Sequence, residues 1–210
     1  MNGAALPTGC YVRRLRPEWP VLASAAAALA IVATLSLALR GAEIPLFLAH
    51  LVVLILATSS AYLLDDSAVQ VTAVVPTSLL RRRLVLLRRG LPVTALSWGA
   101  VMSLLGWRSP SVPLAALTWE VAGVSCLGVA AAAIASRLGD PEPGNLVASV
   151  LGLSFVGMLI VERTFHLVLL GTDGSGTVRA GWWAAVITVS VIMFVVASRD
   201  GAAKGTLSLV

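Results

Sequence analysis

Six apolar runs, each close to the length of a membrane span, constrain this chain more than any other feature. Crossing a bilayer as a helix takes about 20 mostly apolar residues. The runs cover residues 20–39, 44–64, 91–107, 114–136, 146–161 and 182–198. Charged residues make up only 12% of the chain, whereas a soluble domain carries about 25%. The composition therefore excludes a water-soluble domain. It predicts an all-α integral membrane protein with six transmembrane helices in a single domain, residues 1–210.

The basic residues predict the orientation of these helices, because cytoplasmic segments carry an excess of Lys and Arg. With the N-terminus in the cytoplasm, the inner side holds Arg13, Arg14, Arg16, Arg81, Arg82, Arg83, Arg88, Arg89, Arg137, Arg199 and Lys204. The outer side then holds only Arg40, Arg108, Arg163 and Arg179. We therefore expect both termini in the cytoplasm. The net charge of +5 does not indicate nucleic-acid binding, since no separate polar domain is present to carry it.

The segment between the second and third runs, residues 65–89, combines charged, apolar and helix-breaking residues. An acidic pair opens it, and a short amphipathic stretch with several valines follows. Pro76 breaks that stretch, and Thr77 and Ser78 are suited to cap a new helix. One interpretation is a solvated loop with a basic anchor. The other is a short helix on the membrane surface that offers apolar side chains to a cytoplasmic partner.

The order of these residues resembles the first cytoplasmic loop of ABC-2 type transporter permeases. In that family a coupling helix that contacts the ATPase precedes a Pro-Ser/Thr-x-x-Arg region. The residues assigned to the ATPase-coupling loop by this resemblance are Asp65, Asp66, Val71, Thr72, Val74, Val75, Pro76, Thr77, Ser78, Arg81, Arg82 and Arg83. Six spans with cytoplasmic termini are also similar to that family, although many of its members are longer.

The resemblance implies a permease subunit of an ATP-driven exporter. Two ATPase subunits would serve two permease subunits, the second being another copy or a related chain. ATP and Mg would bind to the ATPase, because this sequence has no phosphate-binding G-x-x-x-x-G-K-[ST] motif. The resemblance also places a surface helix at residues 11–19, where a plain basic anchor is the alternative. It places short re-entrant helices at residues 162–181, where an ordinary outer loop is the alternative.

Two ionisable residues inside the runs are candidates for a functional role, because such groups are costly in lipid. His50 lies in the second run and Glu120 in the fourth, both nearer the outer end. They line a substrate path, pair two helices, or simply reach the outer interface. The sequence shows no metal-binding cluster and no catalytic motif, so we do not expect an enzyme.

Other classes remain open beside the exporter, namely a small membrane carrier without an ATPase and an accessory assembly protein in the membrane. Nearly uncharged spans suit an apolar or amphipathic cargo. The preference for Arg over Lys and the high Ala content indicate a GC-rich genome, and therefore a bacterial plasma membrane, with its lipids as partners.

Overall fold

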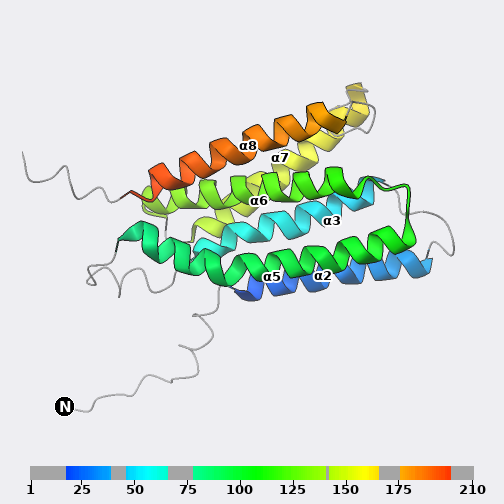
Figure 1. Cartoon of the computed structure of the whole chain (residues 1–210), viewed down its shortest axis with the longest axis horizontal. Coiled ribbons are helices and arrows are strands. Elements are labelled where there is room, and N and C mark those ends of the chain that lie inside the picture. The colour runs from blue at the N-terminus through cyan, green and yellow to red at the C-terminus, as the bar shows by residue number, and fades with distance from the viewer. Residues whose placement is uncertain (1–17, 39–45, 66–77, 141, 166–175, 200–210) are drawn as a thin grey trace, which may run out of the picture.

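The computed structural model describes residues 18–38, 46–65, 78–140, 142–165 and 176–199, and all regular structure among them is helical (Figure 1). The elements are α2 (Glu18–Ala38), α3 (Leu46–Thr58), the 3-10 helix η1 (Ser59–Leu64), α5 (Leu79–Arg108), α6 (Leu114–Arg137), α7 (Pro143–Phe165) and α8 (Gly176–Ala197). The predicted all-α fold is confirmed for these residues.

Three stretches of helix in the described residues are long and apolar enough to cross a membrane: Leu79–Arg108, Leu114–Arg137 and Ala180–Ala197. Shorter apolar helices cover Val21–Thr34 and Leu48–Leu64. Large apolar side chains also point outward, including Leu96 at 76% exposure and Leu153 at 75%. Lipid tails can cover such an apolar surface, whereas exposing it to water costs free energy. These properties are those of a multi-pass membrane protein.

The helices run side by side, with α6 at the centre of the bundle (Figure 1). On one side α6 packs along α8, and on another it packs against α3 and η1. Helix α2 lies along α5, and α7 packs against η1 and α6. Helix α6 is accordingly the most buried of the three long apolar helices.

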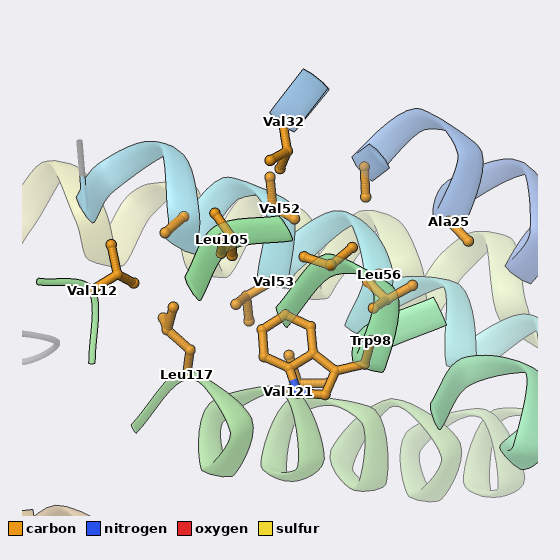
Figure 2. Close-up of a cluster of buried hydrophobic side chains, with 13 residues drawn as sticks. Ala25, Val32, Val52, Val53, Leu56, Trp98, Leu105, Val112, Leu117 and Val121 are labelled. Atoms are coloured by element: carbon orange, nitrogen blue, oxygen red, sulfur yellow. The ribbon is translucent and has the colours of Figure 1, made fainter. Parts of the chain in front are cut away.

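The core contains two clusters of apolar side chains, one toward each end of the bundle. In the first, Trp98 of α5 lies among Val53 and Leu56 of α3 and Val121 of α6 (Figure 2). The second joins Leu63 of η1 to side chains of α2, α5, α6, α7 and α8. Because lipid is as apolar as these side chains, close packing rather than escape from water holds such helices together.

Helix α5 begins at Leu79, directly after the predicted cap at Ser78, and continues through the third apolar run. Leu and Arg are good helix formers, and the Ser78 side chain accepts a hydrogen bond from the Arg81 N–H at 3.4 Å, as an N-cap does. At about 1.5 Å per residue, the helix is about 45 Å long. It therefore exceeds the hydrocarbon core of about 30 Å. Figure 1 shows a bend in α5, and Pro92 inside the helix supplies a cause.

The second apolar run does not form one continuous α-helix, because η1 replaces its last turns. The Ser59 and Ser60 hydroxyls each donate a 2.6 Å hydrogen bond to a carbonyl three residues earlier. Serine side chains that compete for backbone carbonyls in this way disturb α-helical geometry. A proline and a glycine lie where neighbouring helices are connected, since α6 begins directly after Pro113 and Gly139, with a φ of +97°, follows its end.

Candidate functional site: the charged end of the bundle and a buried His–Glu pair

The structure describes part of the predicted coupling loop. Asp65 and Ser78 mark the two ends of the gap, and Arg81, Arg82 and Arg83 lie in the first turns of α5. The others lie outside the described residues: Asp66, Val71, Thr72, Val74, Val75, Pro76 and Thr77. The coupling helix therefore stays a prediction, and the site is built here from the residues on either side of it.

Arg83 is buried at 5% exposure, unlike the exposed Arg81. Its guanidinium donates to the Ala133 carbonyl at 2.9 Å and to the Ser136 hydroxyl, both at the end of α6. It also donates to the Ala197 carbonyl at 3.0 Å and the Ser198 hydroxyl at 2.9 Å, at the end of α8. Arg83 therefore joins the start of α5 to the ends of two other helices.

The position of Arg83 also has an electrostatic basis. The last carbonyls of a helix have no partner within the helix and carry partial negative charge, which favours a cation there. Arg137 reinforces the same junction by donating to the Val196 carbonyl of α8 at 2.8 Å. The basic cluster Arg81–Arg83, which is predicted to set membrane orientation and to belong to the coupling loop, thus also contains a residue that links three helices.

Asp65 holds the other end of the predicted loop. Its carboxylate accepts a 2.8 Å hydrogen bond from the backbone N–H of Gly144, in the first turn of α7. Burial raises the pKa of Asp65 to about 6; the Gly144 hydrogen bond lowers it, and the nearby charges of Glu142 and Asp140 raise it. Gly144 permits this approach, because a Cβ atom there would lie 2.6 Å from the Asp65 Oδ2 atom.

We call Asp65, Arg83 and their hydrogen-bond partners the charged end of the bundle. These contacts connect both sides of residues 66–77 to helices other than the ones that the segment joins. Asp65 ends η1 and binds α7. Arg83 lies in α5 and binds α6 and α8. A displacement of the segment would therefore reach several helices at once, not only the two that it joins.

The two ionisable residues singled out in the apolar runs lie in contact. The His50 Nδ1 atom of α3 is 2.9 Å from the Glu120 Oε1 atom of α6. His50 is 4% exposed and Glu120 is completely buried. This contact joins α3 to α6. The residues next to the pair in the sequence, Ala49 and Val121, belong to the first apolar cluster.

A second polar link accompanies the pair on α6. The Trp98 indole N–H donates to the Thr118 hydroxyl at 3.3 Å, and that hydroxyl donates to the Leu114 carbonyl at 2.8 Å. Sequence reasoning did not single out Trp98 or Thr118. A lone Trp and a lone Thr in apolar runs give no signal until the helices are placed together.

The described residues contain no group of three or more His, Cys, Asp or Glu side chains suited to hold a metal ion. Fold and site together define an all-helical multi-pass membrane protein, with a cross-linked charged end and a buried polar pair inside its apolar bundle. Comparison with family models, curated proteins and solved structures finds no match to this chain.

Proposed function

We propose that this chain is the membrane permease subunit of an ATP-driven exporter of the ABC-2 type. A separate ATPase docks on the segment from Asp65 to Arg83 and moves it during its cycle. The observation that carries the proposal is the attachment of both ends of residues 66–77 to α6, α7 and α8. A coupling segment has to pass its movement on to the membrane helices. Hydrogen bonds from its two ends to other helices pass this movement on better than a segment attached only to the two helices that it connects.

The energy source in this proposal lies in the partner. ATP and Mg bind to the ATPase, and binding favours one arrangement of the bundle through contacts made only in that arrangement. Exposed Arg81, Arg88 and Arg89 on the projecting part of α5 give this end a basic surface. That surface suits both an acidic patch on the partner and anionic lipid headgroups of the inner leaflet.

The cargo in this proposal is apolar or amphipathic and crosses a bacterial plasma membrane. Outward-facing side chains on α7 and α8 include Leu153, Ile160 and Ile192, so the chain has apolar surface to offer lipid or a second permease subunit. A path between two permease subunits requires that second copy or a related chain.

Affinity purification in mild detergent, followed by mass spectrometry, tests the proposal. We expect a stoichiometric ATPase with a phosphate-binding motif to accompany the intact chain. The triple variant Val71→Asp, Val74→Asp and Val75→Asp is expected to lose it, because charge replaces the apolar docking side chains.

The matched control is Leu138→Asp, which adds a charge in the connection that follows α6. Leu138 is 84% exposed and lies outside the proposed docking segment, so the ATPase should remain bound. Absence of any ATPase from the intact chain, under conditions that preserve a known transporter complex, rejects the proposal. Equal loss in both variants rejects the assigned docking segment.

One observation favours a second candidate, a small carrier without an ATPase. Ionisable residues within membrane spans often mark ion or substrate pathways, and His50 and Glu120 form such a pair. A failed search for an ATPase would leave this carrier as the better proposal.

A further inference from the structure

Two contacts on the buried side of α5 fix how its first turns are rotated. Arg83 reaches the ends of α6 and α8, and Gly90 lies so close to η1 that a Cβ atom there would overlap the Leu63 side chain. The opposite side therefore faces away from the bundle. We call it the arginine face, and its exposed residues are Arg81, Leu84, Val85, Arg88 and Arg89.

The positive charge of the arginine face is not balanced by acidic residues around it. Helix α5 contains no Asp or Glu. Arg81, Arg88 and Arg89 form no ion pair with another residue that the structure describes. The first turn of a helix already carries partial positive charge, so an arginine there is unfavourable unless an anion lies nearby. An anion bound at this face would therefore stabilise the start of α5.

Two of these arginines lie at the boundary of the predicted membrane span. The third apolar run begins at residue 91, directly after Arg88 and Arg89. Two or three residues of helix measure about 3–5 Å, and the headgroup layer extends about 5–7 Å beyond the hydrocarbon core on each side. Arg88 and Arg89 are therefore at the depth of lipid phosphates, and a guanidinium binds phosphate oxygens through paired N–H groups.

The apolar members of the arginine face favour a lipid over a free anion or an acidic protein surface. Leu84 and Val85 lie one turn before Arg88 on the same side of the helix, and their exposure to water is costly. A phospholipid offers an anionic headgroup and apolar chains in one molecule, as helices at the membrane surface require. Pro92 follows directly and accounts for the bend in α5 (Figure 1), so these turns leave the direction of the spanning part.

We propose that the arginine face of α5 is a binding site for an anionic phospholipid. Arg88 binds the phosphate, Arg81 and Arg89 add positive charge around it, and Leu84 and Val85 contact the acyl chains. The bound lipid fixes the depth of α5 in the membrane at the end where Arg83 joins α6 and α8. This inference goes beyond the proposed function and does not depend on an ATPase partner.

Native mass spectrometry of the full chain, released from detergent micelles with added lipid, tests the proposal. The method counts the lipid molecules that stay bound and gives their binding constants. We expect anionic phosphatidylglycerol to bind at least about fivefold more tightly than phosphatidylcholine with the same acyl chains, the effect of one basic residue at an anionic headgroup. Equal binding constants for the two lipids would overturn the proposal.

Arg88→Gln should weaken the binding of phosphatidylglycerol about fivefold and leave that of phosphatidylcholine unchanged. Arg199→Gln is the matched control, because Arg199 is exposed at the same end of the bundle and the net charge falls by the same amount. It should change binding little. Equal weakening by both variants would show attraction to the overall charge without a site, and would overturn the inference. Arg89→Gln replaces Arg88→Gln if circular dichroism shows that the latter does not fold.

Two further measurements separate a lipid site from a site for any phosphate. Leu84→Gln keeps every charge and removes apolar contact, so it should weaken the binding of phosphatidylglycerol about threefold. Free glycerophosphate carries a phosphate without acyl chains and should not displace the lipid at equal concentration. Displacement by glycerophosphate, or an unchanged binding constant in Leu84→Gln, would show that the acyl chains are not bound and that the lipid assignment is wrong.

Discussion

Arg83→Met tests whether the charged end of the bundle is held by the buried guanidinium. Methionine keeps the length and apolar stem of the side chain and removes every donor. The guanidinium donates to two carbonyls and two hydroxyls, and a hydrogen bond to a charged group contributes about 1.5–3 kcal/mol. Water recovers part of that loss at the end of the bundle, so we expect the free energy of unfolding to fall by about 3–5 kcal/mol.

Reversible unfolding in mixed detergent micelles, followed by circular dichroism, measures this change. Arg81→Met is the control, because Arg81 lies in the same turns of α5 with an exposed side chain, and exposed substitutions usually change stability by less than about 0.5 kcal/mol. Arg83→Lys should fall between the two, since an ammonium group cannot reach four acceptors as a planar fork does. If Arg83→Met and Arg81→Met unfold alike, the cross-link argument is wrong.

Two further substitutions test contacts of neighbouring elements. Asp65→Asn keeps an acceptor for the Gly144 N–H. Because burial raises the pKa of Asp65 to about 6, the parent should lose stability as pH rises from about 4 through 6, and melting curves of the variant should lack that loss. Gly123→Ala would place a Cβ atom 2.2 Å from the Trp183 ring of α8. It should therefore cost about 1–3 kcal/mol in detergent unfolding, whereas Gly99→Ala, with nothing within 4 Å, should not.

Much of the helical framework follows from the sequence because its signals are local. Apolar length alone marks the runs that become α6 and α8. Pro113 and Gly139 mark turns for reasons intrinsic to each residue, a fixed φ in proline and freedom at positive φ in glycine. Ser78 is recognisable as a cap because its side chain binds a backbone N–H three residues ahead. None of these features requires knowledge of another helix.

Hydropathy and helix propensity diverge at the start of α5, which begins after the predicted cap at Ser78 and ahead of the third apolar run. Five arginines lower the hydropathy of residues 79–90, so the third apolar run begins only at residue 91. Arginine is nevertheless a good helix former. Pro92 lies inside the helix and does not end it. Hydropathy therefore locates the membrane boundary better than it locates the end of a helix that passes through that boundary.

The contacts of the candidate site depend on the rotation of each helix about its axis, which one sequence does not determine. Arg83 differs from Arg81 by two residues, about 200° around a helix, and that rotation separates a buried cross-link from an exposed charge. His50 and Glu120 were each recognisable as costly in lipid. Their pairing depends on α3 lying beside α6, which many arrangements of six helices would not provide.

The charged end of the bundle and the His50–Glu120 contact join different sets of helices. At the charged end, Arg83 and Asp65 attach α5 and η1 to α6, α7 and α8 through directed hydrogen bonds. Further along, the contact between His50 and Glu120 joins α3 and α6 within apolar packing. Separating these two helices would break a polar contact in apolar surroundings, which is costly. The two ends of the bundle are therefore held differently: by hydrogen bonds to the ends of other helices at the charged end, and by a side-chain contact inside apolar packing further along.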